Sequence, residues 1–281
     1  MATTSNRPHP TLVASALRVF NLSLGQMPWS RRSVFLALLV GGPVLLAVIV
    51  RLVGLFVPDS ALRVNGAEVG GPAIFGMMMW LLYIRFIVPV LGAFYGTALV
   101  ADEVDDKTIT YLFTRPIPRG AVVVGKFMAY LVCTALLILP SVVIVYFLTV
   151  PLGGGRIGEH FPSLLADLGM LLAGLVTYGA LFAFVGARLK RPLVIGLVFV
   201  FGWEPGVLLF PGYLKQLTVA YYLQALVPHA MPDDSAVSVL LQTFREMPAV
   251  WTSIVALAAI AGLTLWLAAR SVETREYILE Q

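Results

Sequence analysis

Long runs of apolar residues, separated by short polar segments, make up most of the chain. Six of these runs reach the length that an α-helix needs to cross a bilayer, roughly 20 residues. In lipid, every backbone polar group must be hydrogen-bonded internally, and an α-helix achieves this within one segment. The pattern therefore predicts an all-α integral membrane protein with six transmembrane helices. We expect these helices at residues 34–57, 73–100, 121–149, 164–187, 192–210 and 249–270.

The segments outside the six runs carry weaker patterns. Between residues 11 and 25 apolar positions recur at helical spacing among polar ones, which is typical of a helix lying in the membrane interface. Residues 203–206, Trp-Glu-Pro-Gly, are expected to interrupt the fifth run, and residues 213–227 form an aromatic-rich amphipathic stretch. We therefore predict a tail and interfacial helix at 1–33 and a six-span domain at 34–270. Within that domain we expect an outer re-entrant or amphipathic region at 203–248, and residues 271–281 form a final tail.

Composition supports the membrane class. The chain is 59% hydrophobic and 12% charged, which leaves too little polar surface for a soluble protein of 281 residues. In a soluble protein a net charge of +4 would suggest nucleic acid, but here the basic residues border the apolar runs, so we expect no nucleic-acid partner. Thirteen of the 19 lysines and arginines lie on one side of the predicted spans and four on the other. By the positive-inside rule, both termini are expected in the cytoplasm. We found no metal-ligand spacing and expect no metal site.

A polar elbow at residues 101–120 separates the second and third runs. Glu103 and Lys107 form an i,i+4 pair in the favourable order. The apolar side of a short amphipathic helix is formed by Val104, Thr108, Tyr111 and Leu112. Two prolines, at positions 116 and 118, then stop the helix. A rigid amphipathic helix at a membrane face has a shape suited to contact with a soluble partner.

The elbow also carries a family resemblance. The order of Glu103, Thr108, Leu112, Pro116, Arg119 and Gly125-Lys126 resembles the signature between the second and third spans of ABC-2 type transporter permeases. Lys107 departs from the family pattern, which usually has glycine there. By this resemblance, the elbow is a cytoplasmic coupling helix that docks into a separate ATPase subunit. The coupling residues implied are Glu103, Lys107, Thr108, Tyr111, Leu112, Pro116, Arg119 and Lys126.

The same resemblance implies partners and a location. Two permease copies, in a homodimer or with a related permease, would work with two ABC ATPase subunits in the bacterial inner membrane. Substrate would move outward, and the apolar spans favour a hydrophobic or amphiphilic one. ATP and magnesium are expected on the partner ATPase, whereas this chain is expected to bind no cofactor and to catalyse no reaction itself.

Two motifs keep other interpretations open. Residues 120–127 match most of a phosphate-binding loop, but Phe127 stands where Ser or Thr should bind magnesium, and no strand precedes the motif. The acidic cluster at 102–106 resembles the aspartate-rich metal sites of membrane prenyl or lipid transferases. That enzyme, or a membrane scaffold that transports nothing, remains the alternative to a permease.

Four further residues stand out within the apolar runs. Arg85 and Glu204 are charges deep in apolar sequence, where such groups are usually paired or face water. Their similar distance from the cytoplasmic ends of their spans predicts an intramembrane charge pair, or else a polar element lining an export pathway. Gly92 and Gly96 have the small-xxx-small spacing that lets two membrane helices approach closely, within one chain or between two copies.

Overall fold

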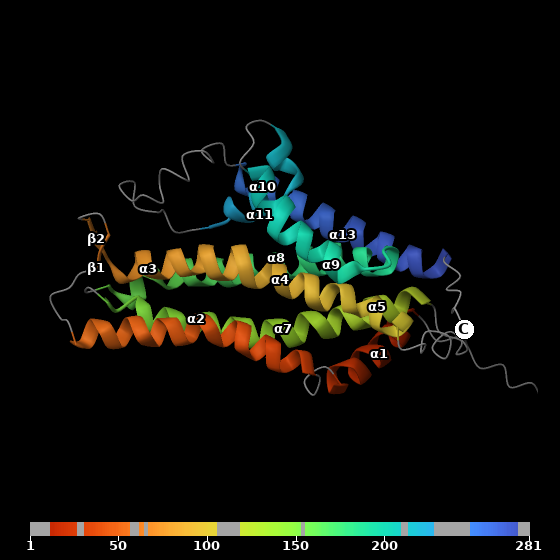
Figure 1. Cartoon of the computed structure of the whole chain (residues 1–281), viewed down its shortest axis with the longest axis horizontal. Helices are drawn as coiled ribbons and strands as arrows, with labels where there is room; N and C mark the ends of the chain where they lie inside the picture. Colours follow the sequence, from red (N-terminus) through yellow and green to blue (C-terminus); the bar gives the residue numbers. More distant parts are fainter. Residues whose placement is uncertain are drawn as a thin grey trace, which may run out of the picture.

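The computed structural model describes residues 12–26, 31–56, 62–64, 67–105, 119–152, 155–208, 213–227 and 248–274. Within these ranges the chain is almost entirely helical, and the long helices run side by side in one bundle (Figure 1). Five helices are long and apolar enough to cross a membrane, namely Val34–Gly54, Gly71–Ala101, Gly120–Thr149, Ile157–Arg188 and Val250–Thr274. The prediction of a helical membrane protein is therefore confirmed.

The remaining predicted span is shorter than the other five. The apolar helix Pro192–Val207 has fewer than 18 residues, whereas a perpendicular crossing needs roughly 20. The count of six spans therefore stays a prediction. The predicted division of the chain into the segments 1–33, 34–270 and 271–281 also stays a prediction.

The described chain begins with two helices and a hairpin. Helix α1 (Leu12–Gln26) covers the stretch expected to be amphipathic, and α2 (Arg31–Phe56) is the first long helix. Strands β1 (Leu62–Val64) and β2 (Ala67–Val69) then pair antiparallel, with Arg63 opposite Glu68. Sequence analysis did not predict this hairpin, although the Asn-Gly dipeptide at 65–66 is a strong signal for one.

The second long helix is continuous but changes its hydrogen-bonding pattern twice. Its segments are α3 (Gly71–Met78), the π-helical η2 (Met79–Ile87), α4 (Val88–Leu91), the π-helical η3 (Gly92–Gly96) and α5 (Thr97–Asp105). In a π-helix each carbonyl bonds five residues ahead, so the turn is wider, and such turns occur frequently at functional sites. The wider turns rotate the side chains of η2 relative to those of a regular α-helix.

Helix α8 (Ile157–Arg188) lies at the centre of the bundle, in contact with α7 (Arg119–Thr149), α5, α9 (Pro192–Val198) and α13 (Val250–Thr274). Small residues let its neighbours approach. A Cβ added to Gly179 would lie 2.3 Å from the ring of Tyr130, and one added to Gly186 would lie 2.4 Å from the carbonyl oxygen of Thr97. Close packing through small residues is a principal source of helix association in membranes.

Buried tyrosines add hydrogen bonds to this packing. The Tyr83 hydroxyl pairs with the Ser141 hydroxyl at 3.0 Å, which joins η2 to α7. The Tyr130 hydroxyl donates to the Leu175 carbonyl at 3.2 Å, which joins α7 to α8. Each bond satisfies a polar group that would be costly to leave unpaired away from water.

The expected interruption at Trp203–Gly206 is wrong. The chain stays helical from α9 through the π-helical η5 (Phe199–Trp203) into α10 (Glu204–Leu208). Proline has no N–H, and its ring clashes with the carbonyl four residues earlier. The π-helical turn directly before Pro205 removes the regular i→i−4 pattern there, so the helix can continue through the proline.

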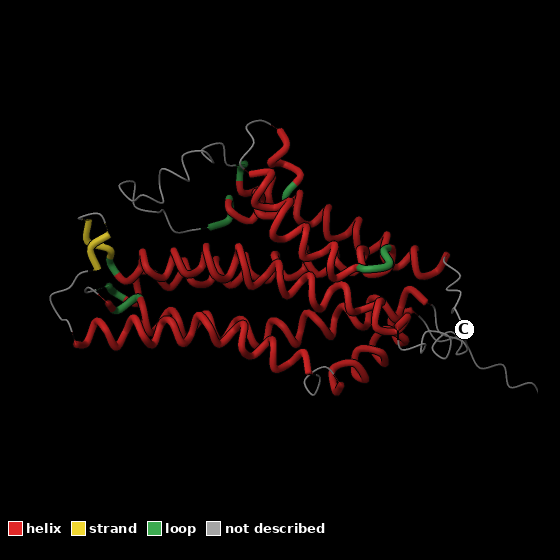
Figure 2. The backbone as a smooth tube through the Cα atoms, in the orientation of Figure 1, coloured by secondary structure: helices red, strands yellow, loops and turns green. Residues whose placement is uncertain are grey.

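Two short helices follow α10 among the described residues of the outer region. The 3₁₀ helix η6 (Tyr213–Leu217) and helix α11 (Val219–Gln224) are separated by Thr218, so the stretch expected to be amphipathic is not one continuous helix. Residues 228–247 lie outside the described ranges. Helix α11 contacts α13, and Figure 2 shows this part of the chain as short helical segments at the upper edge of the bundle.

Candidate functional site

The predicted elbow connects α5 to α7 at one end of the bundle. Glu103 lies in the last turns of α5, and Arg119 is the first residue of α7. The other coupling residues of the elbow, from Lys107 to Pro116, lie outside the described residues, so their role stays a prediction. The chain leaves and re-enters the bundle at the same end, which is the end where α1 lies (Figure 1).

Helix α1 packs directly on the start of α7. A Cβ added to Gly125 would lie 2.5 Å from the carbonyl oxygen of Ala16, so the two backbones touch here. The half-buried Lys126 follows immediately. More than one turn earlier on α7, a Cβ added to Gly120 would lie 2.9 Å from the Glu273 carboxylate of α13. The first and last described helices therefore both contact the helix that leaves the elbow, a juxtaposition that sequence analysis did not foresee.

Basic side chains gather at this end of the bundle. Among the described residues they are Arg18, Lys126, Arg188, Lys190, Arg191 and Arg270. At the opposite end, the exposed Arg156 is paired with Glu159 at 2.8 Å. The bundle is thus more basic at the end that carries α1 and the two ends of the elbow.

The glycines of η3 lie against α8 of the same chain. A Cβ added to Gly92 would lie 2.6 Å from the Cβ of Tyr178, and one added to Gly96 would lie 2.9 Å from the carbonyl oxygen of Gly179. The spacing of these two glycines therefore serves packing within the chain in this structure.

Arg85 projects from the π-helical segment η2. Its guanidinium carbon lies 5.0 Å from the centre of the Trp80 ring, which is within range of a cation–π contact. It also interacts electrostatically with Glu204 of α10, more than a hundred residues later in the chain. The π-helical segment η2 thus carries a half-buried cation that lines a cavity of the bundle, within an apolar helix where a charge is rare and usually functional.

Glu204 is buried, with 4% of its surface exposed, and its carboxylate is held by the start of α11. The Val219 N–H donates to Oε1 at 3.1 Å, and the Ala220 N–H donates to Oε2 at 3.2 Å. These first N–H groups of a helix have no partner within it and carry partial positive charge. The carboxylate is therefore stabilised by α11 as well as by the more distant Arg85.

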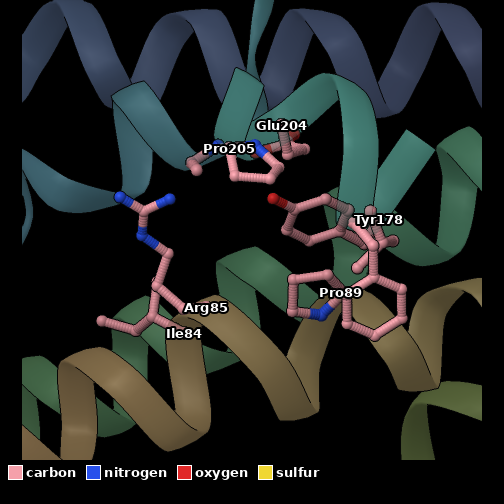
Figure 3. Close-up of a pocket in the computed structure, with 9 residues that line it drawn as sticks. Ile84, Arg85, Pro89, Tyr178, Glu204 and Pro205 are labelled. Atoms are coloured by element: carbon pink, nitrogen blue, oxygen red, sulfur yellow. Dashed lines mark hydrogen bonds between the residues drawn. The ribbon is translucent and has the colours of Figure 1, made fainter. Parts of the chain in front are cut away.

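A cavity of about 200 Å³ separates the two charges. Residues of η2, α4, α8, η5, α10 and α11 line it, and they include Arg85, Tyr178, Phe201 and Glu204. Figure 3 shows Arg85 entering the cavity from one side and the Tyr178 hydroxyl pointing toward the Glu204 side. Arg85 and Glu204 interact electrostatically across this cavity, and the predicted charge pair stays a prediction.

Tyr178 is the member of this group that sequence analysis missed. Its side chain is fully buried, and its hydroxyl interacts with the Glu204 carboxylate, although no hydrogen bond of normal geometry is formed by this hydroxyl among the described residues. A tyrosine within an apolar run looks like an ordinary core residue, so the sequence carries no signal for its position. The cavity therefore presents a cation, a phenol and a carboxylate within one apolar enclosure.

No group of three or more His, Cys, Asp and Glu side chains among the described residues could hold a metal ion. The acidic cluster at 102–106 lies at the end of α5, and its side chains are outside the described ones. The cavity is instead suited to binding a polar group through charge and hydrogen bonds.

Comparison with known sequences assigns the family. No curated protein matches the chain. The sequence model of a family described as ABC-2 family transporter protein matches residues 57–261, which include most of the bundle, the elbow and the cavity. Members of this family are the membrane components of transporters rather than catalysts, and they work with ABC ATPases. The chain therefore belongs to the ABC-2 family of transporter proteins.

Proposed function

We propose that the chain is the permease subunit of an ABC exporter in a bacterial inner membrane. ATP hydrolysed by separate ABC subunits drives it, and two permease copies assemble with two ATPases. The substrate is hydrophobic or amphiphilic and moves toward the outer side of the membrane. The family assignment supports the transport role. The copy numbers, the outward direction and the inner-membrane location rest on the resemblance to ABC-2 type permeases, and the apolar spans favour a hydrophobic or amphiphilic substrate.

One observation carries the proposal. The end of α5, the start of α7, helix α1 and the last turn of α13 meet at one end of the bundle. A partner that contacts the segment between α5 and α7 would therefore push on α7, and α7 is packed against α1 and α13. Motion at this end would pass into α7 and α8 because rigid, closely packed helices transmit displacement.

Charge supports the orientation. The basic residues gathered at the end that carries α1 favour the cytoplasmic side of a bacterial membrane. The elbow would then face the cytoplasm, which is where ATP and an ABC ATPase are found. The same orientation places both termini in the cytoplasm and the β1–β2 hairpin outside.

The proposed function predicts that this chain stimulates its ATPase. The full-length chain and its cognate ABC ATPase are reconstituted in lipid nanodiscs, and ATP hydrolysis is compared with that of the ATPase beside empty nanodiscs. We expect the two proteins to copurify and the hydrolysis rate to rise several-fold when the chain is present. A stable complex with no change in hydrolysis, or no complex at all, would remove the basis for a coupled permease.

A further inference from the structure

The cavity between η2, α8 and α10 is too small for a whole drug-sized molecule. Its volume of about 200 Å³ lies below the range of about 300–1,000 Å³ that is typical of small-molecule sites. A polar head group of several heavy atoms fits such a space, whereas an attached hydrocarbon tail does not. An amphiphile bound here would therefore leave its tail outside the cavity.

The surface beside the cavity is suited to such a tail. Phe201 lines the cavity and is 54% exposed, and its ring lies 6.0 Å from that of Phe86, which is 41% exposed. The adjoining positions Leu81 and Val198 are exposed as well. The cavity thus lies next to an apolar face formed by η2, α9 and η5, which in a membrane is surrounded by lipid.

The lining carries one charge of each sign. Arg85 supplies a cation, and Glu204 supplies an anion whose two oxygens each accept one N–H of α11. Each carboxylate oxygen retains a second lone pair that can accept another bond. The Tyr178 hydroxyl lies between these two side chains and interacts with the Glu204 carboxylate without a hydrogen bond of normal geometry, so it can turn to donate to a ligand (Figure 3).

We propose that this cavity binds the zwitterionic head group of a membrane amphiphile. The anionic part, a phosphate or carboxylate, accepts hydrogen bonds from Arg85 and from the Tyr178 hydroxyl. The ammonium part donates to the free lone pairs of Glu204, and the tail lies along the apolar face of η2 and η5. The structure supplies the binding site, and the claim that the bound amphiphile is the exported substrate rests on the proposed function.

Charge balance favours a zwitterion over a singly charged head group. An anionic head group would pair with Arg85 but would place a second negative charge beside Glu204. A cationic head group would pair with Glu204 but would place a second positive charge beside Arg85. Away from water an uncompensated charge is costly, so a ligand that pairs with both residues is preferred over one that pairs with a single residue.

The two π-helical segments support a binding role. Arg85 lies in η2, Val200 and Phe201 lie in η5, and Glu204 directly follows η5. The cavity is therefore formed where both helices depart from regular α-helical geometry. Such departures weaken a helix and persist mainly where function requires them.

The test measures lipid selectivity on the full-length chain without its ATPase. Native mass spectrometry counts bound phosphatidylethanolamine, which is zwitterionic, against phosphatidylglycerol with the same tails, which is anionic. We expect the wild-type chain to prefer phosphatidylethanolamine. The variant Glu204→Gln should reverse this preference, because the remaining charge in the cavity is then Arg85 alone.

A milder variant keeps the test informative if the charge change disturbs folding. Tyr178→Phe removes only a hydroxyl group, which interacts with the Glu204 carboxylate but forms no hydrogen bond of normal geometry among the described residues, so the chain should fold nearly as before. Loss of one hydrogen bond to the head group should weaken phosphatidylethanolamine binding about 2- to 10-fold. Tyr213→Phe, at a tyrosine that is 86% exposed and outside the cavity, is the matched control and should bind like the wild type.

The outcomes separate this proposal from the transport function. Equal binding of the two lipids, or a preference that Glu204→Gln and Tyr178→Phe both leave unchanged, would overturn the site. If soluble glycerophosphoethanolamine, which has the same zwitterionic head group without tails, competes as strongly as the lipid, the site takes a free zwitterion and the amphiphile is the wrong ligand. A chain that shows the expected selectivity but never stimulates an ATPase would refute the exporter and leave the binding site intact.

Discussion

Replacing Leu112 with aspartate should abolish the stimulation of ATP hydrolysis by this chain. Leu112 belongs to the apolar side of the predicted elbow helix, with Val104, Thr108 and Tyr111. If that side docks into a groove of the ATPase, aspartate would bury an unpaired charge in the contact, and such burial is strongly unfavourable. Hydrolysis in the reconstituted complex should fall to the rate of the ATPase alone.

A matched change on the other side of the same helix provides the control. Asp106 lies away from the apolar side, so Asp106→Asn should leave stimulation close to that of the wild type. Both variants should insert into the membrane normally, because the elbow lies outside the spans. Undiminished stimulation by Leu112→Asp would mean that this helix does not transmit the motion.

The second large effect concerns the charges on either side of the cavity. Removing the cation with Arg85→Leu leaves the buried Glu204 carboxylate opposite an empty space, and loss of one partner of a buried pair typically costs about 3–5 kcal/mol. For a chain of this size we expect the melting temperature in detergent to fall by roughly 10 °C. Glu204→Gln, which keeps an oxygen to accept from Val219, should lower it as well.

The double variant tells whether the two charges depend on each other. If Arg85 and Glu204 compensate each other across the cavity, Arg85→Leu with Glu204→Gln should be more stable than the sum of the single losses predicts. Recovery should be incomplete, because glutamine cannot accept from both Val219 and Ala220 as the carboxylate does. If the losses of stability in the two single variants simply add in the double variant, the two charges are independent, and each contacts water or a ligand.

The long helices were predictable because each one coincides with a continuous apolar run in the sequence. The residues at which these helices begin and end were harder to predict. The fourth predicted span began at residue 164, whereas α8 begins at Ile157 and contains Pro162 near its start. Pro162 is the sixth residue of α8 and so lies inside the helix, where proline normally removes a hydrogen bond. The proline therefore does not mark the start of this helix, and the polar residues before it join the helix as well.

The candidate site was only partly predictable. Arg85 and Glu204 stand out because a charge in an apolar run is costly. The π-helical turns that aim Arg85 inward leave no pattern in the sequence, and the bonds from Val219 and Ala220 to Glu204 depend on how the chain folds back after α10. Tyr178 acquires its significance only from its neighbours, which come from other helices.

The most direct measurement is crosslinking between this chain and its ATPase. A photo-crosslinking residue is placed either at position 112, in the elbow, or at position 156, an exposed site at the opposite end of the bundle. In the assembled complex, position 112 should crosslink to the ATPase and position 156 should not. A crosslink from position 156, or none from position 112 in an intact complex, would contradict both the orientation and the coupling role of the elbow.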